Sequence, residues 1–106
     1  MTTFGLSTQI LAAVIAIFAD LEKIYRVRIF GSRALGRYRP GSDIDLAVEG
    51  QDIDLNYILE IHLKLEALML PYRFDIVHFN NLNQDDKLRE HIDRVGLVLF
   101  ERKAKI

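Results

Sequence analysis

The chain has 106 residues, a formal net charge of −1 and an apolar content of 50%. This length fits one domain, so we predict a single domain over residues 1–106, with the composition of an ordered globular protein. Cysteine is absent, which excludes a disulfide framework and a thiolate metal site and makes the cytoplasm the expected location. The near-neutral charge predicts no direct binding to nucleic acid.

An apolar run over residues 10–19 is the first feature of the chain. It is shorter than the roughly 20 residues that span a bilayer, and residues 1–9 lack the basic residues of a signal peptide, so we expect no membrane contact. We predict a helix over 7–23 with Ser7 or Thr8 as its N-cap. Because the run has no polar stripe, we expect it to be buried on more than one side, with a partner as one candidate cover.

The rest of the chain alternates between strand and helix patterns. Polar and apolar residues alternate before the Gly31-Ser32 turn and again after the Pro40-Gly41 loop, whereas later segments have helical spacing. The predicted elements are strands at 26–31, 43–48 and 74–79, helices at 52–69 and 85–95, and a short strand or helical continuation at 96–100. The fold class is therefore α/β (α+β), with a small mixed sheet of three to four strands packed with about three helices.

Asp43 and Asp45 are two residues apart in a predicted strand, so their carboxylates point to the same face while Ile44 and Leu46 point to the core. Two such charges about 4 Å apart repel by about 4 kcal/mol at an effective dielectric constant near 20. A divalent cation reverses that cost, and Mg²⁺ prefers one or two carboxylates completed by phosphate oxygens. The pair is therefore a candidate metal site.

The Gly31-Ser32 turn is a candidate phosphate-binding segment. Gly31 permits a close approach to the backbone, and Ser32 offers a hydroxyl and an N–H group. Ser42 can supply another phosphate contact. Six basic residues between positions 23 and 39, followed by a cluster of acids, suit an anionic, metal-bound ligand.

Asp75 is the third candidate carboxylate. If the strand 74–79 lies beside 43–48, Asp75 joins Asp43 and Asp45 on one face. Three carboxylates can hold two metal ions, which bind a triphosphate and stabilise the departing pyrophosphate. Asp75 is then the general base or the ligand that lowers the pKa of the attacking hydroxyl.

These motifs together resemble the nucleotidyltransferase superfamily: Gly31-Ser32, Arg33 and Gly36, then Ser42-Asp43-Ile44-Asp45-Leu46, with Asp75 some thirty residues later. The short chain is similar to the minimal nucleotidyltransferases (MNT) that are encoded beside a small helical HEPN protein in toxin–antitoxin modules. The resemblance covers essentially the whole chain.

The resemblance implies Mg²⁺-dependent transfer of AMP from ATP to a hydroxyl, with a tyrosine of the HEPN partner as the expected acceptor. By position, Gly31 and Ser32 bind phosphate and the three aspartates bind metal. Two alternatives stay open: a non-catalytic antitoxin that masks its partner, and transfer to a small-molecule hydroxyl. The preferred nucleotide and the stoichiometry stay open too, and a homo-oligomer is possible.

Other charged residues carry weaker signals. Arg33 is equally suited to contacting phosphate and to a structural ion pair. We expect Arg37 and Arg39 to be solvated loop charges. The histidines lie on separate predicted elements, so we expect structural or surface roles for them: His62, His78 and His91. A P-loop is excluded because Arg37 and Tyr38 occupy the positions that need Lys and Ser/Thr. Ala47 in place of an oxygen ligand excludes an EF-hand.

Overall fold

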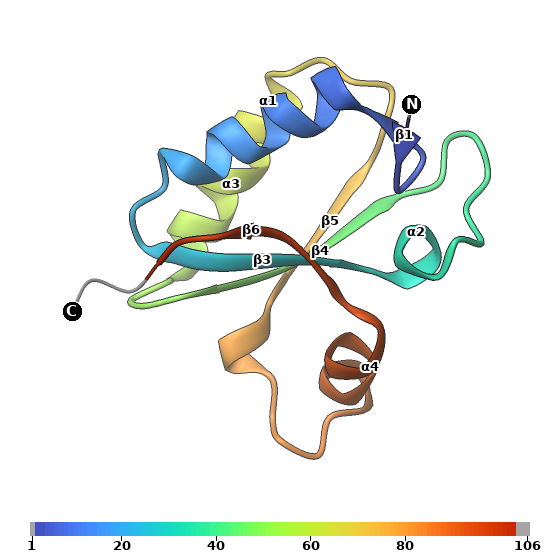
Figure 1. Ribbon diagram of the computed structural model, residues 1–106. Coiled ribbons are helices and arrows are strands. Elements are labelled where there is room, and N and C mark those ends of the chain that lie inside the picture. The colour runs from blue at the N-terminus through green and yellow to red at the C-terminus, as the bar shows by residue number, and fades with distance from the viewer. Residues whose placement is uncertain (1, 104–106) are drawn as a thin grey trace.

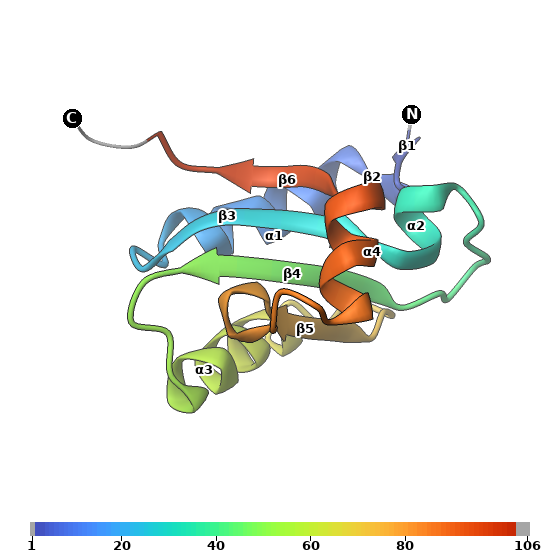
Figure 2. The same ribbon diagram turned by 90° about the horizontal axis from the view of Figure 1, so that it is seen from below.

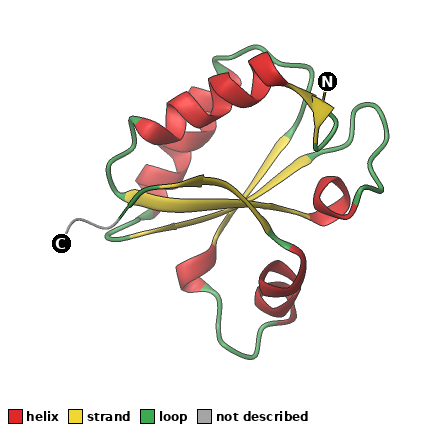
Figure 3. Cartoon of the chain, in the orientation of Figure 1, coloured by secondary structure: helices red, strands yellow, loops and turns green. Residues whose placement is uncertain are grey.

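A four-stranded mixed sheet forms the centre of the molecule. The computed structural model describes residues 2–103, and in it helices flank the sheet (Figure 3). The strands lie in the order β5-β4-β3-β6 (Figure 2). β3 is antiparallel to both of its neighbours, whereas β4 and β5 are parallel. The bounds of the strands are Ile24–Phe30 for β3, Ile44–Gly50 for β4, Phe74–His78 for β5 and Leu97–Glu101 for β6.

Helices cover both faces of this sheet. α1 (Thr8–Ala19) and α3 (Leu55–Glu66) lie together on one face, and α4 (Lys87–Val95) crosses the other (Figures 1 and 2). The 3₁₀ helix η1 (Phe79–Asn81) follows β5 on the α4 side, and the short α2 (Gly31–Leu35) lies at one end of the sheet. A small hairpin of β1 (Thr2–Thr3) and β2 (Leu6–Ser7) precedes α1.

Side-chain oxygens mark where each long helix begins. Ser7 Oγ accepts a hydrogen bond from Ile10 N at 3.2 Å, and Asp54 Oδ1 accepts one from Tyr57 N at 2.8 Å. Asp86 caps α4 in the same way. Because each cap satisfies a backbone N–H that lacks a helical partner, these residues fix the helix starts.

The predicted fold class and sheet are confirmed, and the differences are local. The predicted helix 7–23 ends at Ala19, since Ile24 already pairs in β3. Residues 97–101 form a strand rather than a helical continuation, and the β1–β2 hairpin was not predicted. Residues 2–103 contain four α-helices where about three were expected. β4 begins at Ile44, so Asp43 lies in the loop just before it.

Strand alternation divides the core into two clusters. The larger cluster lies between the sheet and the α1–α3 layer, and the smaller one lies beneath α4. The larger includes Val14, Phe18, Val27, Ile29, Leu46, Val48, Ile61 and Leu65. The smaller contains Phe30, Ala47, Phe79 and Ile92. The position of Ile92 confirms the prediction that the last helix turns this residue inward.

The prediction that residues 10–19 are buried on more than one side is wrong for this chain by itself. In α1 only Val14 and Phe18 are buried, while Ala12, Ala16 and Ala19 are exposed. Alanine adds little apolar area, so a helix rich in alanine tolerates a solvent-facing side. Three large apolar side chains are exposed along α3: Leu55 (82% exposed), Leu59 (54%) and Leu63 (62%).

No helix within residues 2–103 is both long enough and apolar enough to cross a membrane.

Candidate active site

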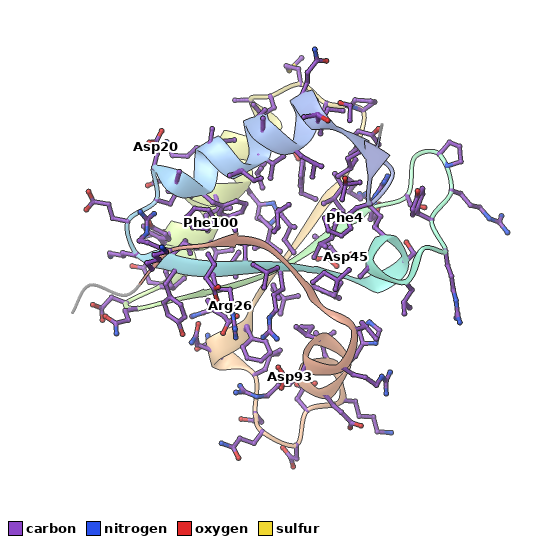
Figure 4. The ribbon with its side chains drawn as sticks, viewed as in Figure 1. Phe4, Asp20, Arg26, Asp45, Asp93 and Phe100 are labelled. Atoms are coloured by element: carbon purple, nitrogen blue, oxygen red, sulfur yellow. The ribbon has the colours of Figure 1, made fainter. Side chains whose placement is uncertain are left out.

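Two of the three predicted carboxylates lie directly opposite each other on neighbouring strands. The parallel register pairs Asp45 of β4 with Asp75 of β5, and the antiparallel register pairs Asp45 with Phe30 of β3. Paired residues on adjacent strands point to the same face of a sheet. That face is the α4 side, because Phe30 belongs to the core cluster beneath α4. Figure 4 shows Asp45 beside α2, at the end of the sheet.

Asp43 also acts on this pair from the preceding loop. Burial raises the pKa of Asp45 to about 6, and the charges of Asp75 and then Asp43 add to the shift. Asp45 is half-buried, whereas Asp43 and Asp75 are exposed. The three predicted carboxylates are thus near enough to repel one another, with Asp45 at the least solvated position.

These carboxylates suit a metal ion that takes some of its ligands from a bound substrate. In the part of the chain that the structure describes, no three His, Asp or Glu side chains form a complete metal-binding group by themselves. Mg²⁺, however, needs only one or two carboxylates and takes its other ligands from water and phosphate. Burial raises the pKa of Asp45, the charges of Asp75 and Asp43 add to the shift, and a divalent cation would offset these effects. The carboxylates therefore suit a nucleotide-bound cation.

The Gly31 turn lies against the Asp45 carboxylate. Gly31 has φ = +72°, a left-handed conformation that side chains disfavour, and a Cβ built there would overlap Asp45 Oδ2. Glycine is therefore required for two independent reasons. Ser32 follows in α2 and is half-buried. The structure thus brings the predicted phosphate turn next to the predicted metal carboxylates.

Arg33 of α2 is only 3% exposed, and its guanidinium is held by backbone carbonyls. Its Nη2 donates to Ser42 O at 2.8 Å, its Nε donates to Asp43 O at 3.3 Å, and its Nη1 donates to Phe4 O at 2.8 Å. These hydrogen bonds join α2, the loop before β4 and the N-terminal hairpin. This geometry favours the structural alternative for Arg33, because the guanidinium holds the loop that carries Asp43.

Ser42 also contributes to the loop. Its Oγ accepts a hydrogen bond from Arg39 N at 2.8 Å, and Ser42 N donates to Arg39 O at 2.9 Å. The hydroxyl predicted to contact phosphate is therefore already engaged as an acceptor, although its own hydrogen can still be donated.

The basic stretch is only partly directed toward a ligand. Arg26 donates to both oxygens of Glu49, at 2.5 and 2.8 Å, and this hydrogen bonding raises the pKa of Arg26. Arg28 lies 3.3 Å from Glu49 and donates to Asp93 Oδ1 at 3.1 Å. Figure 4 shows Arg26 and Asp93 on the α4 side of the sheet, away from Asp45. Arg26 and Glu49 thus pair within the sheet, and Arg28 links the sheet to α4 through Asp93, contrary to the expectation that these charges serve an anionic ligand.

His91 is a residue of this site that the sequence did not reveal. Its ring packs edge-on against Phe30, with ring centroids 6.1 Å apart and an interplanar angle of 80°. Whereas burial raises the pKa of Asp45, positive charge on Arg33 and on His91 lowers it. No spacing rule connects His91 with Asp45, because the two meet only when α4 folds back across the sheet (Figure 2).

A comparison with protein families gives the class of this protein. Residues 12–105 match the family model described as "Polymerase beta, Nucleotidyltransferase". The mixed sheet with its carboxylates and glycine turn is thus a nucleotidyltransferase domain. The chain is also 32% identical over 112 aligned positions to "Probable protein adenylyltransferase MntA" of Haemophilus influenzae, covering 100% of this chain and 95% of that protein. The chain belongs to the polymerase β nucleotidyltransferase family, in its minimal (MNT) branch.

Solved structures share the fold. The crystal structure of a toxin–antitoxin with AMP-PNP has a TM-score of 0.72 at 24% identity, covering 88% of this chain and 74% of that chain. The tri-AMPylated Shewanella oneidensis HEPN toxin in complex with its MNT antitoxin has a TM-score of 0.67 at 22% identity, covering 89% and 71%. The predicted nucleotidyltransferase fold is therefore confirmed.

Proposed function

We propose that this chain transfers AMP from ATP to a tyrosine hydroxyl of a small helical HEPN toxin, and that it acts in this way as an antitoxin in the cytoplasm. The observation that carries the proposal is the pairing of Asp45 with Asp75 beside the Gly31 turn. The relatives supply the reaction class, since one is described as a protein adenylyltransferase and another is an MNT antitoxin bound to an AMPylated toxin.

Within this proposal Asp43, Asp45 and Asp75 are both the catalytic and the metal-binding residues. They would hold Mg²⁺, with two ions bound when the triphosphate is present. When bound, the metal neutralises the phosphate oxygens and the departing pyrophosphate. Asp45 would be the central metal ligand, because the charges of both Asp75 and Asp43 act on its carboxylate.

The remaining residues of the site orient the nucleotide and move a proton. Gly31 and Ser32 contact phosphate from the turn beside Asp45, while Arg33 and Ser42 hold the loop that presents Asp43. The tyrosine oxygen forms a bond to the α-phosphorus of ATP as the bond from that phosphorus to the β-phosphate oxygen breaks. Pyrophosphate leaves, and the tyrosine proton passes to Asp75, which is exposed and can reach an incoming hydroxyl.

The test is label transfer between purified proteins. The chain is incubated with the product of the neighbouring gene, Mg²⁺ and ATP labelled at the α-phosphate. We expect label on a tyrosine of the partner, and at least a hundredfold slower labelling with Asp43→Asn. Asp20→Asn is the matched control, because Asp20 is an exposed aspartate at the end of α1 and far from Asp45 (Figure 4).

The same preparation distinguishes transfer from masking. An Asp43→Asn protein that neutralises the partner as fully as the wild type, with no label transferred by either, would contradict the proposal and support a masking antitoxin. Label that appears on an added small-molecule alcohol, with none on the partner, would support the small-molecule alternative.

A further inference from the structure

A triphosphate beside Asp43, Asp45 and Asp75 needs positive groups of the protein in addition to metal, because both substrate and site are anionic. Two side chains that can donate hydrogen bonds lie close to the carboxylates and the glycine turn. Arg33 follows Gly31 in α2, and His91 of α4 packs against Phe30, which pairs with Asp45 in the strand register. These two side chains are therefore the candidates for a phosphate contact near Asp45.

Arg33 is already engaged. It is 3% exposed, and its guanidinium donates to three backbone carbonyls. Turning it toward a ligand would remove these hydrogen bonds and leave buried carbonyl oxygens without a donor, at a cost that one new contact does not offset.

The His91 side chain is available to contact a ligand. Its ring is half-buried against Phe30, the residue that precedes Gly31 and lies opposite Asp45 in the register. Among the residues that the structure describes, neither ring nitrogen makes a hydrogen bond. An imidazole retains at least one N–H donor whether it is neutral or protonated. The packing of α4 thus holds a spare donor beside the carboxylates and the glycine turn.

We propose that His91 is a nucleotide-binding residue that donates a hydrogen bond from its ring to the phosphates of bound ATP. This inference rests on the proposed function, since it takes ATP as the ligand of the site. The edge contact with Phe30 orients the imidazole. The contact joins α4 to the nucleotide, so that one side of the phosphates is held by the turn and the other by His91.

The experiment measures the dissociation constant of ATP in the presence of Mg²⁺ by calorimetry. His91→Phe keeps a ring to pack on Phe30 but removes the donor, and His91→Gln keeps a donor. His62→Phe is the matched control, because His62 lies on α3 at the other face of the sheet. We expect His91→Phe to weaken ATP binding about tenfold or more, His91→Gln to stay within about threefold of the wild type, and His62→Phe to have no effect.

Two results would overturn the proposal: His91→Phe that binds ATP as the wild type does, or His91→Gln that loses as much affinity as His91→Phe. His91→Leu, which also lacks a donor, replaces His91→Phe if thermal unfolding reveals that Phe disturbs the fold. Failure of the wild type to bind ATP would overturn this proposal and the proposed function together. Wild type that binds ATP through His91 but transfers no AMP would contradict the proposed function alone.

Discussion

The two faces of the sheet differ in chemistry although the same strands build both. On the α1–α3 face, β3 and β4 present fully buried aliphatic side chains such as Ile29 and Leu46. On the α4 face the same strands present Arg28, Asp45 and Glu49, of which Arg28 and Glu49 are buried as well. Alternation along a strand thus gives one face to hydrophobic packing and the other to charge.

This difference separates stability from chemistry. The apolar face stabilises the fold through burial of apolar surface, which is non-directional and tolerates small shifts of the side chains. The charged face depends on geometry, because a buried charge without its partner costs several kcal/mol. Along that face the charges are paired at the Glu49 end, and like charges are left together at the Asp45 end, where we place the nucleotide. The following changes test the comparison.

The largest effect on stability should come from the apolar face. Phe18 is 0% exposed, so Phe18→Ala should lower the free energy of unfolding by about 3–5 kcal/mol, because it leaves a cavity between α1 and the sheet. Urea unfolding measures the loss. Leu59→Ala on the exposed side of α3 is the control and should change it by less than about 1 kcal/mol. Equal losses would contradict the assignment of the core.

The second-largest effect on stability should come from Glu49 on the charged face. Glu49→Gln removes the charge that neutralises Arg26 and Arg28, and it should cost about 3 kcal/mol in the same unfolding measurement. Glu101 is 3.9 Å from Arg26 with a side chain that is 58% exposed, so Glu101→Gln should cost less than about 1 kcal/mol. A Glu49→Gln variant as stable as Glu101→Gln would show that the buried pairs of Glu49 with Arg26 and Arg28 contribute no more to stability than an exposed ion pair.

Substitutions at Gly31 and Gly36 distinguish the cost of backbone strain from the cost of a close contact with Asp45. Both have φ = +72°, but Gly31 faces the Asp45 carboxylate, whereas no atom of the described residues lies within 4 Å of a Cβ built at Gly36. Gly36→Ala should therefore cost about 1 kcal/mol, and Gly31→Ala about 2 kcal/mol with a marked loss of AMP transfer as Asp45 is displaced. Similar rates of AMP transfer in the two variants would show that the Gly31 turn is not part of the active site.

The smallest effect is the pH dependence from Asp45. Its pKa of about 6 in the folded chain lies above the unfolded value near 4, so the folded state binds the proton more tightly. The contribution of Asp45 to stability is therefore greatest below about pH 4 and falls as the pH rises to about 6. Allowing for solvent screening, the fall is about 1 kcal/mol.

The difference in unfolding free energy between Asp45→Asn and the wild type isolates this titration. Asp45→Asn should become the relatively more stable protein over that pH range, and Mg²⁺ should reduce its advantage. A difference that does not change with pH would contradict the raised pKa.

The sequence predicted the sheet, and the face on which Asp45 and Asp75 lie, because both follow from local patterns. Period-two alternation orients Asp45 and Asp75, and the Pro40-Gly41 loop separates the strands, whereas Asp43 was expected in the strand and lies just before it. Only one unknown was non-local, namely whether the strand of Asp75 lies beside β4, and the parallel register confirms that it does.

What could not be predicted depends on tertiary packing. The burial of Arg33 requires the N-terminal hairpin and the loop before β4 to meet at α2. The approach of His91 requires α4 to pack across the sheet, against Phe30. No periodicity encodes such encounters, because they depend on how elements distant in sequence lie against each other.

The most direct test of the metal site is a crystal structure of the chain with Mn²⁺ and a non-hydrolysable ATP analogue. Anomalous scattering should locate Mn²⁺ at about 2.1 Å from carboxylate oxygens of Asp43 and Asp45, with the triphosphate between the metal and the Gly31 turn. Nucleotide bound elsewhere, or bound at the turn with no metal on these aspartates, would contradict the account.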